Sequence, residues 1–141
     1  MSVHRRAALF GGAVVLAATL VPATIASAAT GVGVASTASL VSSGSVFRVN
    51  VTYKCEPGTA GGVSVEAHQN VGGGFVANGY GFARGKLTCD NKNHVVRITV
   101  TPSGERGFKK GNAFLMADVS SCNNETGNCD LASVERTIKI Q

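Results

Sequence analysis

The sequence contains no tryptophan, and aromatic residues of all kinds make up 6% of the chain. Without tryptophan the chain cannot form the buried Trp–disulfide core of antibody domains, and a carbohydrate-stacking platform is disfavoured. Clusters of basic residues are also missing after residue 28, where the densest basic pair is Lys109-Lys110. Nucleic-acid binders gather basic residues on one face because phosphate neutralisation dominates their affinity. The sequence therefore predicts no nucleic-acid partner.

Motifs for catalysis and for metal binding are absent as well. The chain has no G-x-S-x-G nucleophile elbow and no C-x-x-C pair of the kind that zinc sites use. We interpret His68, on an outward strand face, and His94, after a turn, as surface residues. Glu66, Asp90 and Asp118 offer carboxylates for acid–base chemistry, but the sequence does not bring them together. The sequence predicts neither an enzyme nor a cofactor or metal site, and a site formed by His68, His94 and Asp90 is the alternative.

The first 28 residues have the pattern of a cleaved secretory signal peptide. Arg5 and Arg6 precede the apolar run "AALFGGAVVLAATLV", and "ATIASAAT" supplies the small residues that a signal peptidase recognises. Cleavage after Ala28 or Ala29 fits, either the general or the twin-arginine export route is open, and an uncleaved membrane anchor is the alternative. Residues 29–141 then form one domain, with eleven Lys and Arg against eight Asp and Glu, a net charge of +3.

All four cysteines lie in this exported part of the chain: Cys55, Cys89, Cys122 and Cys129. An even number of cysteines in a short exported protein predicts disulfides, and four cysteines permit three pairings. Cys122 and Cys129 are separated by six residues, which favours this pair and leaves Cys55 to Cys89.

Alternation of apolar and polar residues with a period of two runs through most of the exported chain, whereas no segment has a helical stripe. Turn sequences such as "EPGTAGG" and "CDNKN" separate the alternating segments. We predict an antiparallel immunoglobulin-like β-sandwich of seven or eight short strands. The expected core consists of Phe47, Val49, Val51, Val65, Val96, Ile98, Leu115, Val119 and Ile138.

The stretch "NGYGFARG" at residues 78–85 shares letters with the aromatic octapeptide of RNA-recognition motifs. That motif begins with a basic residue and needs two helices packed on its sheet, and neither condition is met. We interpret the stretch as part of a glycine-rich hairpin with Tyr80 and Phe82 on one strand face. Phe75, Tyr80, Phe82 and Arg84 are the candidate binding patch, because aromatic residues and arginine contribute much of the energy of interfaces. The alternative is that the rings cover the core.

Four motifs in this order together suggest a family: Tyr53-Lys54-Cys55, the strand ending "EAHQN", "CDNKNHVVRITV" and "GNAFLMADV". The chain resembles small exported actinobacterial proteins of unknown function over roughly residues 45 to 120. In those proteins a Tyr-x-Cys strand pairs with a later Cys-Asp-x-x-x-His strand in an immunoglobulin-like sandwich. The resemblance implies a Cys55–Cys89 disulfide and no activity. Antitumour chromoprotein apoproteins are a more distant comparison. Both of their disulfides close short loops, whereas Cys55 and Cys89 are 34 residues apart in this sequence.

We therefore hypothesise a secreted, non-catalytic binding module that acts at the cell surface or in the medium. Its partner would be an extracellular protein or a cell-wall component, and its exported chain would not span a membrane. The alternative is a secreted protease-type inhibitor that presents residues 123–128 as a loop pinned by Cys122 and Cys129, because a disulfide orders a recognition loop before binding.

Overall fold

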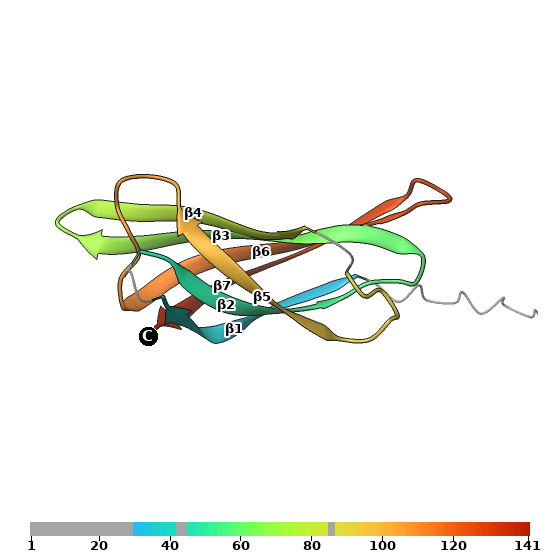
Figure 1. Ribbon diagram of the computed structural model, residues 1–141, viewed down its shortest axis with the longest axis horizontal. Coiled ribbons are helices and arrows are strands. Elements are labelled where there is room, and N and C mark those ends of the chain that lie inside the picture. Colours follow the sequence, from blue (N-terminus) through green and yellow to red (C-terminus); the bar gives the residue numbers. More distant parts are fainter. Residues whose placement is uncertain (1–29, 42–44, 85–86) are drawn as a thin grey trace, which may run out of the picture.

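The computed structural model describes residues 30–41, 45–84 and 87–141, so the predicted signal peptide lies outside the described residues. These residues form seven strands, which close into a barrel in the order β1-β2-β5-β4-β3-β6-β7 (Figure 1). The strands are β1 (Gly31–Leu40), β2 (Phe47–Lys54), β3 (Thr59–Gly72), β4 (Phe75–Arg84), β5 (His94–Pro102), β6 (Gly111–Asn123) and β7 (Cys129–Ile140).

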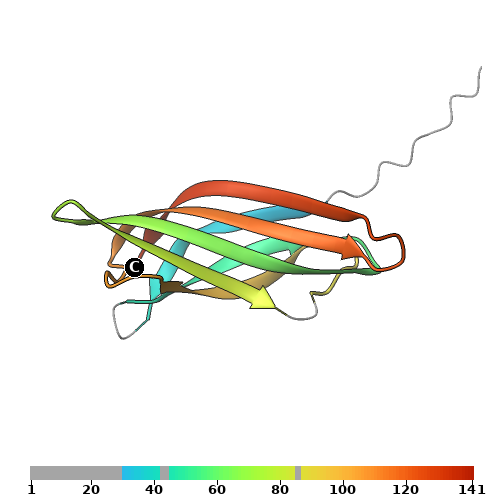
Figure 2. The same ribbon diagram turned by 90° about the horizontal axis from the view of Figure 1, so that it is seen from above.

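The prediction of an antiparallel sandwich is wrong, because the first and last strands pair with each other. β1 lies antiparallel to β2 and parallel to β7, with Thr37 opposite Lys139 and Ala38 opposite Ile140. This parallel pair joins the two edges that a sandwich would leave separate. Figure 2 shows β4, β3, β6 and β7 side by side, with β1, β2 and β5 behind them, as two sides of one closed sheet.

The inner and outer faces of the strands follow the alternation in the sequence. In β2, Phe47, Val49, Val51 and Tyr53 are buried and the residues between them are exposed. The same pattern in the other strands fills the barrel with aliphatic side chains, as expected for strands with one buried face. Of the expected core, Val96 is partly buried and the others are buried: Phe47, Val49, Val51, Val65, Ile98, Leu115, Val119 and Ile138.

Two glycines in "NGYGFARG" allow β5 to cross close to β4. A Cβ atom on Gly79 would lie 2.6 Å from the ring of Phe108, and one on Gly81 would lie 2.5 Å from the carbonyl oxygen of Thr99. Only glycine fits where a neighbouring backbone or ring approaches so closely. Because the glycines face inward, Tyr80 and Phe82 face outward, and their predicted placement on one strand face is confirmed.

Side chains fill one end of the barrel and hold its connecting loop in place. Phe108, from the segment between β5 and β6, packs edge-on against Phe47 with ring centroids 4.8 Å apart. The buried Gln69 side chain accepts a hydrogen bond from the backbone N–H of Lys109 and donates one to its carbonyl, both at 2.8 Å. This paired contact fixes the loop that carries Phe108.

The two predicted disulfides are confirmed, with Cys55 bonded to Cys89 and Cys122 bonded to Cys129. The first links the end of β2 to the segment before β5, near the backbone N–H of Thr88, which donates to the Tyr53 hydroxyl at 3.1 Å. The second joins opposite residues of β6 and β7 at the pair next to the loop that connects the two strands. Disulfides persist in oxidising compartments, so this pair is consistent with an extracellular protein.

Candidate functional site

The outward faces of β3, β4 and β6 meet in a regular grid of side chains, which we call the Tyr80 face. The strand registers align three rows across it. From β4 through β3 to β6, the rows are Phe82–Ser64–Asp118, Tyr80–Glu66–Met116 and Asn78–His68–Phe114. Directly opposed side chains in antiparallel strands lie close enough to interact, so the face combines aromatic rings with carboxylates.

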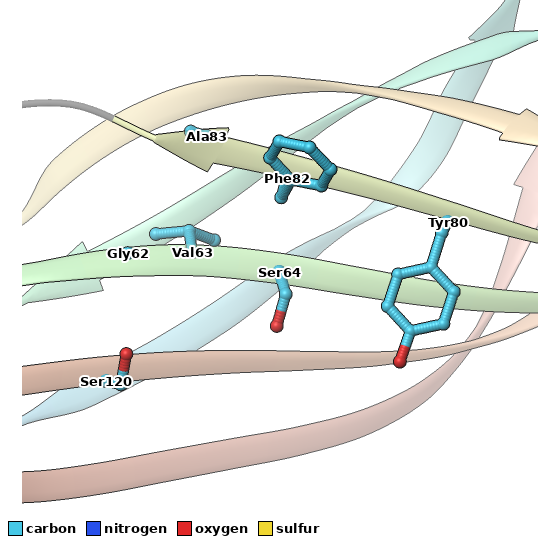
Figure 3. Close-up of a pocket in the computed structure, with 7 residues that line it drawn as sticks. All are labelled: Gly62, Val63, Ser64, Tyr80, Phe82, Ala83 and Ser120. Carbon is cyan, nitrogen blue, oxygen red and sulfur yellow. The ribbon is translucent and has the colours of Figure 1, made fainter.

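The aromatic rings of the Tyr80 face are open to solvent. Tyr80 is 55% exposed, Phe82 is 59% exposed and Phe114 is 41% exposed. Tyr80 and Phe82 border a shallow hollow of about 270 Å³. In Figure 3 both side chains rise from β4, and the Tyr80 ring lies across β3 with its hydroxyl toward β6. The other residues around the hollow are Gly62, Val63, Ser64, Ala83 and Ser120.

A chain of polar contacts orients the side chains in the middle of the Tyr80 face. The Tyr80 hydroxyl lies 3.5 Å from Glu66 Oε2, and Glu66 Oε1 lies 3.1 Å from His68 Nε2. The other ring nitrogen of His68 lies 2.8 Å from Asn78 Oδ1. These contacts restrict the rotamers of Glu66 and His68 beside Tyr80, which lowers the entropy cost of ordering them against a partner.

The structure separates Phe75 from Tyr80 and Phe82 in the predicted patch. Phe75 lies on the other side of β4 from Tyr80 and Phe82, because its position differs from each of theirs by an odd number of residues along an extended strand. The carbon of the Arg106 guanidinium lies 3.9 Å from the centroid of the Phe75 ring, and Phe75 remains 48% exposed. The side chain of Arg84 is outside the described residues. Among the patch residues whose side chains the structure describes, Tyr80 and Phe82 share a surface.

Sequence reasoning did not connect Glu66, His68 and Asn78 with Tyr80. Each lies next to Tyr80 through the β3–β4 register. A partial signal was present, because the "VGGG" turn between two alternating segments indicates a hairpin. A bulge between Asn70 and Gly72 shifts the register, so counting from the turn does not by itself align Tyr80 with Glu66. The turn contains positive φ values at Gly72, Gly73 and Gly74, which tight turns require.

The two histidines of the described residues lie at different places, each next to a carboxylate. His68 contacts Glu66 on the Tyr80 face, whereas His94 Nε2 lies 2.7 Å from Asp90 Oδ1 at the start of β5. The hydrogen bond with His94 lowers the pKa of the Asp90 carboxyl from its usual 3.8, and the backbone N–H of Lys92 lowers it further. Among the described residues, no group of three or more histidine, cysteine or acidic side chains could hold a metal ion.

The loop at residues 123–128 is exposed and tightly folded. Asn123 Oδ1 accepts hydrogen bonds from the backbone N–H groups of Glu125 and Thr126, at 2.8 and 3.0 Å. The N–H of Gly127, which has a φ of 72°, donates to the Asn123 carbonyl at 2.9 Å. The backbone of the loop is therefore curled around Asn123 and not extended.

Comparisons with models of known protein families and with curated proteins give no match for this chain. Within the described residues, no helix has the length and apolar character that crossing a membrane requires.

Proposed function

We propose that this protein is a secreted, non-catalytic binding module that recognises an extracellular protein through the Tyr80 face. The observation that supports this function is the solvent exposure of three aromatic side chains on one regular sheet surface. Exposed tyrosine and phenylalanine supply large contact area with few rotatable bonds, and such residues are enriched where binding energy concentrates. The two disulfides suit the same extracellular setting.

The chemistry of the face indicates the kind of partner surface. Glu66 and Asp118 stand within the grid of aromatic residues, and Ser133 donates a hydrogen bond of 2.5 Å to Asp118 from the neighbouring β7. A partner that presents apolar side chains flanked by lysine or arginine would complement both the rings and the carboxylates. Charge complementarity of this kind increases association rates and selects among partners.

The 123–128 loop is the weaker candidate because of its shape. Its exposure fits a protease inhibitor, but the hydrogen bonds to Asn123 hold it in a curl. Recognition by strand addition needs an extended segment, whose backbone groups pair with the partner. The Tyr80 face needs no rearrangement before it meets a partner.

A photo-crosslinking experiment tests the proposal and compares it with the loop. A photoreactive phenylalanine analogue replaces Phe82, Glu125 or Val95 in three otherwise unchanged proteins, which are then irradiated with the culture medium and cell-wall fractions of producing cells. Val95 is the matched control, since it is 65% exposed on β5. We expect one adduct of defined mass from position 82, weakened by Tyr80→Ser.

Two outcomes would overturn the proposal. An adduct from position 125 without one from 82 would assign recognition to the loop. Equal adducts from positions 82 and 95, or no adduct from 82 in either fraction, would show that the Tyr80 face is not a specific surface. Circular dichroism of each protein confirms that the replacement leaves the barrel folded.

A further inference from the structure

The side of the barrel formed by β1, β2 and β5 has a charge pattern unlike that of the Tyr80 face. These three strands contain Arg48, Lys54 and Arg97 and no aspartate or glutamate. The remaining strands contain all the carboxylates that lie in the sheet, including Glu66 and Asp118. The separation follows from the strand order, because β1, β2 and β5 are neighbours in the barrel although β5 is distant from β1 in sequence.

A bulge in β1 opens a hollow on this basic side. Val34 is opposite Val51 and Ala38 is opposite Val49, so three residues of β1 face the single residue Asn50. Such a bulge bends its strand and interrupts the ladder; here Arg136 Nη1 donates to the Val34 carbonyl at 2.8 Å. The hollow beside the bulge measures about 250 Å³ and is lined by Ala35, Thr37, Ala38, Ser39, Arg48, Asn50 and Arg97.

Two arginines border this hollow without a neutralising carboxylate. Arg97 is opposite Asn50 and Arg48 is opposite Thr99, so the arginines are diagonal neighbours on the outer face. Side chains of this length reach one another across that separation. Neither arginine forms an ion pair with a carboxylate of the described residues. Arg97 Nε instead donates a long hydrogen bond of 3.4 Å to Asn50 Oδ1. Two neighbouring positive charges repel, and an anion between them removes that repulsion.

We propose that the hollow bordered by Arg48, Arg97 and the β1 bulge binds a tetrahedral oxyanion, the phosphate or sulfate group of a larger molecule. Guanidinium groups donate to such oxygens in pairs of hydrogen bonds, and two arginines on different strands approach the anion from two directions. The hydroxyl groups of Thr37 and Ser39 in the lining supply further donors. No aromatic side chain lines the hollow, so the base stacking that single-stranded nucleic acids use has no counterpart here.

The test is an NMR titration of the ¹⁵N-labelled, oxidised protein at constant ionic strength. Inorganic phosphate, inorganic sulfate and acetate are added separately, with chloride adjusted to compensate. We expect saturable shifts of the Ala35, Thr37 and Asn50 amides with phosphate or sulfate, and weaker shifts with acetate. The variant Arg48→Gln/Arg97→Gln should bind about tenfold more weakly, because it loses two solvent-exposed charge contacts. Lys54→Gln is the matched control, since Lys54 lies on the same face of β2 but does not line the hollow.

Titrations with methyl phosphate and methyl sulfate then distinguish the two sources of the anion, since the ester with the higher affinity identifies the group. The proposal is wrong if the shifts do not saturate, if they spread over lysine and arginine residues all around the barrel, or if the double variant binds like Lys54→Gln. Equal affinity for acetate would also overturn it, because a planar carboxylate would then fit as well as a tetrahedral anion. This site is independent of the Tyr80 face, so either proposal can fail alone.

Discussion

The ring of Phe108 occupies the space where a side chain on Gly79 would have to be. A Cβ atom at position 79 would lie 2.6 Å from one ring carbon of Phe108, and equally close to the carbonyl oxygen of Thr101. The loop that closes one end of the barrel and the strand that carries Tyr80 are therefore fitted to each other. The glycine next to the exposed tyrosine is a requirement of barrel packing.

We expect Gly79→Ala to lower the free energy of unfolding by about 2–3 kcal/mol, as overpacking in a close-packed interior does. The Thr101 carbonyl belongs to the β4–β5 pairing, and the Phe108 ring is held against Phe47. Urea denaturation measures the effect. Gly104→Ala is the control, because a Cβ atom on Gly104 would have no other atom within 4 Å, and it should change stability by less than about 0.5 kcal/mol.

The Gln69 side chain offers a second stability test. Gln69→Leu removes both contacts with the Lys109 backbone and should cost about 2–3 kcal/mol, because part-buried polar groups lose their partners. Hydrogen exchange at the Lys109 amide should become faster. Asn70→Ala, which removes an exposed side-chain contact with the Gly72 N–H, should have a smaller effect. Equal effects of the two variants would show that Gln69 does not fix the loop.

Removal of the disulfides should have unequal effects on stability. In the chain-entropy model, Cys55→Ser/Cys89→Ser should lose about 4 kcal/mol and Cys122→Ser/Cys129→Ser about 2.5 kcal/mol, because the first bond closes a longer loop. The sequence separations are 34 and 7 residues. Denaturation of each double variant measures the difference. A larger loss from the shorter loop would mean that native contacts, and not chain entropy, decide the outcome.

The Asp90–His94 contact predicts a specific pH dependence. The hydrogen bond from His94 holds the pKa of Asp90 below 3.8, so the ionised carboxylate stabilises the fold above the unfolded-state pKa of about 3.9. That contribution is lost as the pH falls through the lower folded-state pKa. Carboxyl ¹³C NMR should show Asp90 titrating below its usual range, and His94→Ala should raise its pKa. His68→Ala, at the other histidine, should leave the Asp90 titration unchanged.

Strand faces could be predicted from the sequence because burial on one side of a sheet imposes a period of two. Phe47, Val49 and Val51 faced the interior as expected, and the short spacing of Cys122 and Cys129 correctly indicated their disulfide. These features depend on local pattern alone. The resemblance to small actinobacterial proteins stays a prediction, since it rests on motifs that the structure does not test.

Closure of the barrel could not be predicted in the same way. A sandwich and a barrel have the same alternation of inward and outward residues, so the pattern in β2 or β3 fits both. The deciding contacts lie between Thr37 and Lys139 and between Ala38 and Ile140, about a hundred residues apart in the chain. No local signal marks that pairing. Gly79 and Gly81 were a clue, because glycine at alternate inward positions indicates a close strand crossing.

Prediction of the candidate sites from the sequence was limited in the same way, because part of each site depends on pairing between distant strands. The grouping of Tyr80 with Phe82 followed from their spacing of two residues, whereas Phe75 was assigned to the patch although its spacing puts it on the opposite side of β4. Arg48 and Arg97 could not be connected from the sequence, because their proximity depends on the β2–β5 register.

The parallel pairing of β1 with β7 also affects the order in which the strands pair during folding. Strands that are neighbours in sequence, such as β3 and β4, can pair as soon as both are synthesised. β1 must wait for β7, which is synthesised after the other six strands of the barrel. Contacts between distant segments carry the larger loop-closure entropy and slow the folding of β proteins. Until β7 arrives, the exposed edge of β1 is open to pairing with another molecule. The chain is thus most vulnerable to aggregation immediately before its last strand closes the ring.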